Sequence, residues 1–235
     1  MTDRQVKSRK RVAEHGEVFT AEREVNAMLD LVKPETERID SRFLEPACGD
    51  GNFLAEILRR KLAAVRARYR KSPADYEKYA VLAVMSLYGV ELLQDNVEAC
   101  RARLFAIWDA AYAENCRREC RENCREAVRY ILARNILCGN ALTLKAVDAA
   151  GRDTDEPIIF SEWSFTGRSS VKRSDYRLDV LMRDRDVEPR QQLSMFEDDA
   201  GDVVPLMEDP ETKKLIPKPI REYPPVYYWR VQEAG

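Results

Sequence analysis

The residues best suited to chemistry lie in the stretch 43–54, FLEPACGDGNFL. A short apolar run ends at the carboxylate Glu45, and Gly49 and Gly51 follow one residue apart before a helix is expected to begin. Glycines accept positive φ and leave bare backbone for a ligand, and a helix N-terminus adds unpaired N–H groups. We therefore expect a strand, a tight turn and a helix start that together hold a small ligand.

The same stretch narrows the class of ligand. A dinucleotide fingerprint requires a third glycine where Leu54 stands, and no Gly-Lys-Ser/Thr of a phosphate-binding loop follows. The carboxylate of Glu45 would repel a phosphate, but it suits a cationic ammonium or sulfonium group. A second carboxylate, Glu91, ends the apolar run Leu87–Glu91, and at a strand tip it can accept both hydroxyl groups of a ribose.

Two phrases, EPACGDGNFL at 45–54 and YGVELLQDNVEAC at 88–100, resemble those of class I S-adenosylmethionine-dependent methyltransferases. The first is most similar to the DNA adenine-N6 methyltransferases of restriction-modification systems, and the resemblance covers residues 17–163. It implies an α/β fold of the Rossmann-like, three-layer kind with a mostly parallel sheet, which we expect to be truncated or incomplete after the fourth strand. It also implies S-adenosylmethionine as cofactor, DNA as partner and methyl transfer as the activity.

The resemblance also implies the cofactor contacts. The family packs an aromatic phrase before the first helix over the bound methionine, and Phe19 and Thr20 stand there, although Ala21 replaces the family's proline. Asn140 replaces an aspartate that accepts the adenine amino group, and its side-chain oxygen can still accept this bond. The expected cofactor-binding residues are Phe19, Thr20, Glu45, Pro46, Ala47, Gly49, Gly51, Asn52, Phe53, Glu91, Leu92, Asn140 and Leu142.

The elements that would position these residues alternate between helices and short apolar strands. Apolar spacing predicts helices over 21–32 and 52–71 and a further helix that continues through Ile107. Buried strands are expected at 43–45, 87–91, 136–138 and 158–160, with strand-like runs at 176–180 and 226–231. We divide the chain into a flexible basic arm (1–16), a cofactor-binding methyltransferase-like domain (17–185) and a charged, Pro-rich C-terminal segment (186–235) that ends in the strand 226–231.

The acceptor side of the resemblance is incomplete. In the adenine methyltransferases the fourth strand ends in Asn/Asp/Ser-Pro-Pro-aromatic, which holds the target amino group and stacks on the flipped base. Here the strand at 158–160 runs into Ser161-Glu-Trp163 without the two prolines. Ser161 and Trp163 are candidates for holding the acceptor, and the sequence assigns no catalytic residue. Two hypotheses follow: an active DNA methyltransferase, or a catalytically inactive, cofactor-binding accessory or DNA-docking subunit.

A row of cysteines, Cys116, Cys120 and Cys124, opens a third hypothesis. This spacing would place three thiols along one face of a helix. The last interval is one residue too long for the C-x3-C-x2-C of radical enzymes, and the single histidine, His15, has no second histidine as a partner. We therefore assign no metal ligands and expect half-buried structural thiols, whereas a metal or radical enzyme would contain bound iron or zinc.

Composition restricts the partners and the compartment. The 235 residues carry a net charge of -2 with 34% charged residues, so bulk electrostatics identifies no partner. Basic residues concentrate in 1–16 and 59–71, where they could contact DNA phosphates or form solvated surfaces. No run is apolar and long enough to span a membrane and no signal peptide is indicated, which predicts a cytoplasmic protein with free thiols.

One short motif indicates a protein partner. Gln192–Phe196, QLSMF, is similar to the peptide by which bacterial proteins bind the DNA sliding clamp, whose apolar residues enter a groove. The alternative is an apolar segment that packs on its own domain. Because the chain has no room for a separate target-recognition domain, we also expect a partner subunit.

Overall fold

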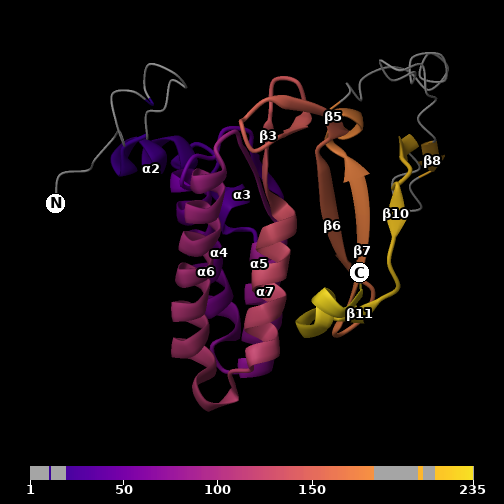
Figure 1. Ribbon diagram of the computed structural model, residues 1–235. Coiled ribbons are helices and arrows are strands. Elements are labelled where there is room, and N and C mark those ends of the chain that lie inside the picture. The colour runs from indigo at the N-terminus through magenta and orange to yellow at the C-terminus, as the bar shows by residue number, and fades with distance from the viewer. Residues whose placement is uncertain (1–10, 12–19, 183–205, 209–214, 235) are drawn as a thin grey trace.

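A five-stranded sheet in the order β1-β2-β3-β4-β5 lies at the centre of the computed structural model, which describes residues 11, 20–182, 206–208 and 215–234 (Figure 1). β1, β2 and β3 are parallel, and β4 and β5 continue the sheet in antiparallel fashion. The strands span Phe43–Glu45, Leu87–Glu91, Ile136–Asn140, Lys145–Val147 and Asp153–Pro157. The expected α/β class, with a sheet that begins as parallel strands, is confirmed.

Helices connect the parallel strands and form one layer against this sheet (Figure 1). The helices are α2 (Glu22–Asp30), α3 (Lys33–Glu37), α4 (Asn52–Tyr69), α5 (Pro73–Met85), α6 (Gln94–Cys116), η1 (Arg117–Glu119) and α7 (Glu122–Asn135). α4 and α5 lie between β1 and β2, and α6, η1 and α7 lie between β2 and β3. Apolar side chains that recur every three or four residues bury one face of α4, namely Leu54, Ile57, Leu58, Leu62 and Val65.

The starts of α4 and α5 follow from local sequence. Gly51 precedes α4 with φ of 88°, a value that glycine adopts without steric cost. Ser72 precedes α5, and its side chain accepts a hydrogen bond from the backbone N–H of Asp75 at 3.3 Å. Pro73 occupies the first turn, where a missing N–H costs no helical hydrogen bond.

The opposite face of the central sheet is covered by a second sheet. Successive residues of β2 point to opposite faces, so Leu87 joins the core under the helices, whereas Tyr88 and Val90 pack in a second cluster with Ile158 and Phe160. β7 pairs antiparallel with three other strands of this sheet. Its strands are β6 (Ile159–Phe165), β7 (Ser170–Arg177), β10 (Arg221–Glu222) and β11 (Val226–Tyr227). The third layer thus consists of strands (Figure 1).

The remaining elements are α8 (Leu178–Leu181), a strand pair of β8 (Leu206–Glu208) and β9 (Leu215–Pro217), and η2 (Tyr228–Ala234). η2 packs on α7, and Tyr228 Oη donates a hydrogen bond to the buried Glu77 at 2.9 Å. No helix in the described ranges combines the length and apolarity needed to cross a membrane. The domain boundary at 185 and most of the arm 1–16 lie outside the described residues, so both stay predictions; Arg11 of the arm pairs with Asp95 at 2.6 Å.

Three expected strands differ from the structure. The residues 158–160 do not form a fourth parallel strand of the central sheet, because they lead into β6, which pairs antiparallel with β7. The strand expected over 226–231 is limited to β11, because the chain continues as a 3-10 helix from Tyr228. The run 176–180 is divided between β7 and α8. Short apolar runs carry no signal for strand direction or length.

The cysteine row does not lie on one helix face, so that expectation was wrong. α6 ends at Cys116, Arg117 takes φ of 48°, and Cys120 follows η1, which leaves Cys124 on a different helix, α7. Cys116 and Cys124 are buried, and burial raises the pKa of Cys116 to about 12. In the part of the chain that the structure describes, no group of three histidine, cysteine or acidic residues could hold a metal ion.

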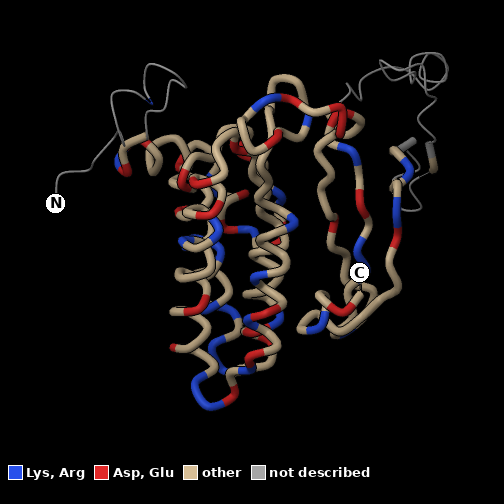
Figure 2. Tube along the Cα trace, viewed as in Figure 1, with Lys and Arg blue, Asp and Glu red and all other residues tan. Residues whose placement is uncertain are grey.

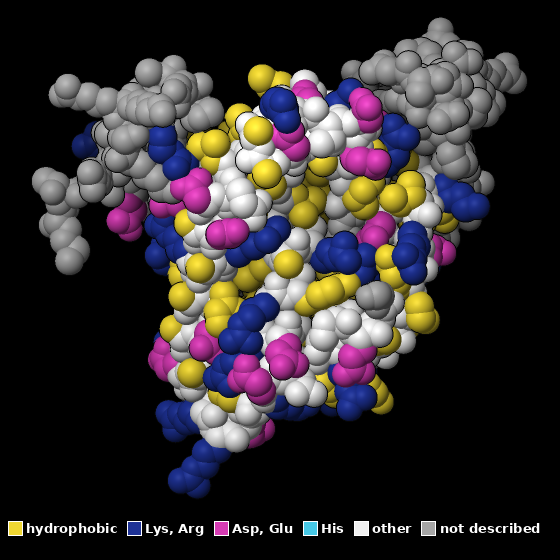
Figure 3. Space-filling view, in the orientation of Figure 1, with side chains coloured by type: hydrophobic (Ala, Val, Ile, Leu, Met, Phe, Trp, Pro, Cys, Tyr) yellow, Lys and Arg dark blue, Asp and Glu magenta, His cyan; other side chains and the backbone are white. Residues whose placement is uncertain are grey.

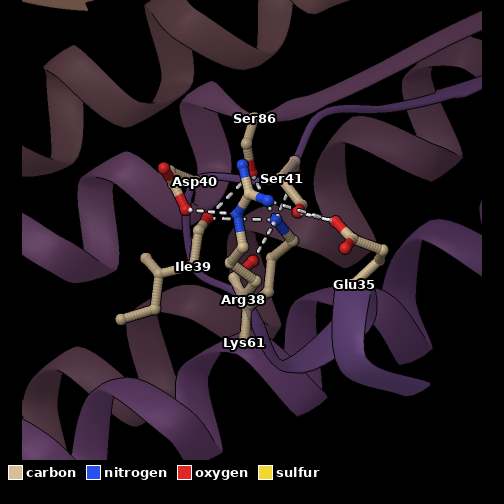
Figure 4. Close-up of polar contacts among 7 residues, drawn as sticks. All are labelled: Glu35, Arg38, Ile39, Asp40, Ser41, Lys61 and Ser86. Carbon is tan, nitrogen blue, oxygen red and sulfur yellow. Dashed lines mark hydrogen bonds and ion pairs between the residues drawn. The ribbon is translucent and has the colours of Figure 1, made fainter. Parts of the chain in front are cut away.

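Lys61 is a buried cation that joins α4 to the segment before β1 (Figure 4). Its Nζ donates hydrogen bonds to the carbonyl oxygens of Arg38 at 3.1 Å and Ile39 at 3.0 Å, to Ser86 Oγ at 2.8 Å, and to the carbonyl of Ser41. Burial lowers the pKa of Lys61 to about 7. The amino end of the central sheet is therefore fixed by one side chain with several acceptors.

Replacing Lys61 by Met removes the donors but keeps the length of the side chain. Buried oxygens would then lack a hydrogen bond, so we expect the free energy of unfolding to fall by about 2–4 kcal/mol, measured by urea unfolding. The control, Arg59→Met, changes an exposed arginine of the same helix. It should change the free energy of unfolding by less than about 0.5 kcal/mol. Similar losses in the two variants would contradict this role of Lys61.

The same pair of variants tests the protonation of Lys61. Between about pH 7 and the ordinary lysine pKa of 10.5, the unfolded chain binds a proton that the folded chain has released. The contribution of Lys61 to the free energy of unfolding therefore rises with pH over this range. Lys61→Met should remove this rise, and Arg59→Met should keep it.

Candidate functional site

A cavity of about 710 Å³ opens where the carboxyl ends of β1, β2 and β3 meet. The loop after β1, the tip of β2 with the start of α6, and the loop after β3 line it. The residues expected to bind the cofactor that lie in its wall are Thr20, Glu45, Pro46, Ala47, Gly49, Asn52, Phe53, Glu91, Leu92, Asn140 and Leu142. Phe19 lies outside the described residues. The structure thus brings together residues as distant in sequence as Thr20 and Leu142.

Glu91 connects two walls of the cavity. Its Oε2 accepts a hydrogen bond from the backbone N–H of Gly49 at 2.9 Å, and its Oε1 accepts one from the N–H of Leu93 at 3.0 Å. The side chain of Asn96 also donates to Oε1, at 3.4 Å. The carboxylate therefore holds the glycine loop against the start of α6, at the tip of the strand where the sequence predicted it.

Three carboxylates lie in the cavity wall, those of Glu45, Glu91 and Asp50, and Asp50 pairs with Arg103 at 3.4 Å. Burial raises the pKa of Glu45, and the backbone N–H of Ala47 partly offsets this effect. Neither Glu45 nor Glu91 forms an ion pair with another residue in the described ranges. A partly buried carboxylate without a cationic partner is stabilised by a positively charged ligand. The carboxylates of Glu45 and Glu91 therefore fit a ligand that carries a cationic group and hydroxyl groups.

The two glycines of the loop have different roles. Gly49 lines the cavity with φ of 52°, whereas Gly51 does not lie in the cavity wall. A Cβ on Gly51 would lie 2.6 Å from Sγ of Cys100 on α6. Gly51 is therefore required by the close approach of α6 and by its own φ of 88°, and the contact with the cofactor expected for it has no support in its position.

Asn140 is held by neighbours on both sides of its amide. Its Oδ1 accepts a hydrogen bond from the N–H of Leu142 at 3.0 Å, and its Nδ2 donates to Asp153 Oδ1 at 2.9 Å. The hydrogen bonds from Thr143 and Asn140 lower the pKa of Asp153. Leu142 projects from the same turn with 95% of its surface exposed. The turn after β3 thus presents an oriented amide and a large apolar side chain at the rim of the cavity.

Asn52, the first residue of α4, fixes the wall on the other side. Its Nδ2 donates to the carbonyl oxygen of Thr20 at 3.1 Å, and its Oδ1 accepts from Arg103 at 2.6 Å. Arg103 also lies 3.4 Å from Asp50 Oδ1. The segment before α2, the glycine loop and α6 are thereby tied together around the cavity.

Several residues of the cavity wall were not predicted. They are Cys48, Asp50, Leu93, Asn96, Gly139 and Ala141. All except Asn96 lie beside or between predicted residues in sequence, so contiguity alone could have included the loop positions. Asn96 also stands five residues after Glu91 in the phrase at 88–100, and that spacing was a usable signal.

Ser161 and Trp163 do not lie at the cavity, and their candidacy as acceptor contacts has no support in their positions. Both are buried: Ser161 Oγ donates to Asp175 at 2.7 Å, and Trp163 Nε1 donates to Asn135 Oδ1 at 2.9 Å. Asn135 in turn donates to the carbonyl of Leu87 at 3.0 Å, at the amino end of β2. The two side chains thus lie toward the end of the sheet away from the cavity.

The direction of β6 explains this placement. Ile158, directly before β6, lies against Gly139 near the carboxyl end of β3, whereas Glu162 pairs with Arg42, directly before the amino end of β1. β6 therefore runs opposite to the parallel strands and carries its last residues away from the cavity. A strand parallel to β1 would have carried them toward it.

Comparison with known families gives one result. The model of the family described as MmeI, DNA-methyltransferase domain, matches residues 20–186. A search of curated proteins and a search of solved structures returned no match. The matched range contains the described residues that line the cavity.

The close contact at Gly51 can be tested against a matched glycine. Gly51→Ala and Gly151→Ala both place a Cβ on a residue with positive φ, but only at Gly51 would the Cβ meet another atom within 4 Å. We expect Gly51→Ala to lower the free energy of unfolding by about 1–3 kcal/mol more than Gly151→Ala, because a packed core resists the added atom. Thermal and urea unfolding measure the difference.

A double variant that combines Gly51→Ala with Cys100→Ala provides the control. Because the contacted atom is Sγ of Cys100, removing it should recover part of the loss. Equal stability of the two glycine variants, or no recovery in the double variant, would show that α6 does not restrict this position.

Proposed function

Because the chain belongs to the family of the MmeI DNA-methyltransferase domain, we propose that its cavity binds S-adenosylmethionine and that the protein methylates DNA in a restriction-modification or phage system. The position of Glu91 carries the proposal: a carboxylate at the tip of β2, bonded to the glycine loop and facing a cavity. A ribose bound there would find an open acceptor position on Oε2 for one of its hydroxyl groups, and a second hydroxyl group would take the place of the 3.4 Å bond from Asn96 on Oε1.

The other residues of the wall complete this proposal. Glu45 is suited to attract the sulfonium and ammonium groups of the cofactor, and Asn140 is suited to the adenine amino group. Leu92 and Leu142 offer apolar surface to the adenine ring. The backbone of Thr20, tied to Asn52, supports the methionine side of the cavity. When bound, the cofactor supplies an activated methyl group for transfer to a nucleophile.

We further propose the adenine amino group of DNA as the acceptor. This rests on the similarity of the phrase at 45–54 to the adenine-N6 methyltransferases. An amino group of a base becomes accessible when the base leaves the helix stack. The sliding-clamp peptide expected at Gln192–Phe196 lies outside the described residues and stays a prediction.

A second candidate function is favoured by the direction of β6. Since Ser161 and Trp163 are buried at the other end of the sheet, the described residues offer no acceptor clamp of the Asn/Asp-Pro-Pro kind at the cavity. Methyl transfer depends on alignment of donor and acceptor. The chain by itself would then bind the cofactor as an accessory subunit, and a partner would supply the acceptor contacts.

Cofactor binding is tested by removing the charge of Glu91. Glu91→Gln keeps the size of the side chain, but it provides one acceptor oxygen where the carboxylate provides two. We expect calorimetry with S-adenosylmethionine to show at least tenfold weaker binding, which corresponds to about 1.4 kcal/mol. Glu98→Gln, an exposed change on α6, is the matched control and should bind as the unmodified protein does. Equal affinity of the two variants would refute the proposal.

The pH dependence of binding tests the role of Glu45. Because burial raises the pKa of Glu45, the side chain takes up its proton at a higher pH than an exposed glutamate. A neutral acid attracts a cation less, so affinity for S-adenosylmethionine should fall as the pH decreases through this pKa. Glu45→Gln should make the affinity less dependent on pH. It should also weaken the binding of S-adenosylmethionine more than that of S-adenosylhomocysteine, which lacks the sulfonium group. Parallel curves for the variant and the unmodified protein would exclude this role.

Methyl transfer separates the two candidate functions. The proposed activity predicts that the purified chain incorporates label from S-adenosylmethionine into bacterial DNA, and that incorporation disappears in Glu91→Gln but persists in Glu98→Gln. Binding of labelled S-adenosylmethionine without incorporation would instead establish the chain as an accessory subunit, as the direction of β6 favours. The calorimetric affinity, measured on the same samples, shows whether the cofactor is bound in each case.

A further inference from the structure

Positive charge gathers at the end of the helix layer opposite the cofactor cavity. A second cavity, of about 930 Å³, lies between the C-terminal ends of α4 and α6. The basic side chains in its wall are Arg66, Arg70, Lys71, Arg117 and Arg118, and the acidic ones are Glu114 and Glu119. Figure 2 shows the basic residues in the turn after α6, and Figure 3 shows Lys and Arg side chains projecting from this tip of the molecule.

Most of these basic side chains form no ion pair with a described residue. Arg66 pairs with Glu114 at 2.8 Å, but Arg70, Lys71, Arg117 and Arg118 are exposed and form no ion pair with any residue that the structure describes. Some arginines elsewhere on the helix layer form ion pairs; an example is the pairing of Arg125 with Asp109 at 2.6 Å. The second cavity thus has an excess of cations although the whole chain has a net charge of -2.

The backbone at Arg117 is a second, independent feature. Arg117 ends α6 with φ of 48° and ψ of -112°, a conformation that residues with a Cβ rarely adopt. Strained conformations of this kind persist where the surrounding structure requires them, and they concentrate at functional sites. Here the turn brings Arg117 and Arg118 beside the end of α4, which contributes Arg70 and Lys71.

We propose that this second cavity binds phosphate groups of the backbone of duplex DNA, at a docking site separate from the cofactor cavity. The inference deepens the proposed function, since it rests on DNA as the partner. Guanidinium groups bind phosphate oxygens in a bidentate manner, and lysine adds a point charge. Two helix ends that each present cations without partners can contact a phosphate from two sides.

The geometry of α4 sets the distance between the two sites. The helix begins at Asn52 in the wall of the cofactor cavity and has 18 residues, so at about 1.5 Å per residue it spans about 27 Å. At about 3.4 Å per base pair this corresponds to about eight base pairs. A duplex that reaches both sites would therefore extend about eight base pairs beyond the methylated base on one side.

The alternative use of these cations is electrostatic. The C-terminal ends of α4 and α6 carry partial negative charge, which nearby cations stabilise. In that case their removal would lower the melting temperature and leave DNA binding unchanged. Stability and DNA affinity must therefore be measured on the same variants.

The test compares two double variants that lose the same charge. The first double variant, Lys71→Gln with Arg118→Gln, changes the second cavity. The second, Arg168→Gln with Lys218→Gln, changes two exposed cations that form no ion pair with a described residue, one in the loop between β6 and β7 and one in the segment before β10. Binding of a labelled duplex of about 20 base pairs is followed by fluorescence polarisation over a series of salt concentrations. We expect at least tenfold weaker binding for the first pair, and a salt dependence that is less steep by about 0.9 for each phosphate that the protein no longer neutralises. The second pair should bind within twofold of the unmodified protein.

Three results would overturn the inference. Equal losses in the two double variants would indicate general attraction, and an unchanged affinity in the first pair with a lower melting temperature would assign the cations to the helix ends. Binding of inorganic phosphate that is lost in the first pair, with no binding of the duplex by the unmodified protein, would assign the cavity to a free anion. Calorimetry with S-adenosylmethionine on the same variants distinguishes failure of this site from failure of the cofactor site, which should be unaffected.

Discussion

The carboxylate of Glu91 is the interaction on which the cavity side of the molecule depends. β1 has three residues, and the loop after it would otherwise be tied to its neighbour by few backbone bonds. With one oxygen bonded to Gly49 and the other to Leu93, the carboxylate fixes the distance between the glycine loop and the start of α6. Each oxygen has two lone pairs. Since Asn96 also donates to Oε1, the open acceptor position lies on Oε2, where Glu91 can accept a hydroxyl group of a ligand and keep these bonds.

The parallel half of the fold could be predicted because its signals are local. The run Leu87–Glu91 is buried and apolar, and the helix from Asn52 shows its buried face in the spacing of Leu54, Ile57, Leu58, Leu62 and Val65. The third layer could not be predicted in this way. The residues 158–160 are compatible with burial in either direction, and only pairing with β7, which is a tertiary contact, decides that β6 runs against the central sheet.

The site was predictable to the extent that its residues are contiguous. Once the glycine loop and the tip of β2 were placed, the neighbours of Gly49 and Glu91 had to line the same cavity. Gly51 lies outside the cavity wall, and its position depends on Cys100, a residue of α6 that packs against it, so its contact with the cofactor stays a prediction. The cysteine row was misjudged because positive φ at Arg117, a residue that rarely adopts it, ends the helix between Cys116 and Cys120. The local sequence indicates neither the packing of Cys100 on Gly51 nor the positive φ of Arg117.

A buried ion pair within β7 holds Ser161 of β6 in the second sheet, away from the cavity. Arg173 is 3% exposed and donates to both carboxylate oxygens of Asp175, at 2.8 and 2.7 Å, while Ser161 Oγ donates to the same carboxylate at 2.7 Å. Burial raises the pKa of Asp175, but the bonds from Arg173 and Ser161 more than offset this effect and lower it. Removing one partner would leave a buried charge unpaired, and the resulting loss of stability is larger than the stabilisation from a surface contact. Ser161 would have to leave this group to reach the cavity, which favours other residues for acceptor contacts there.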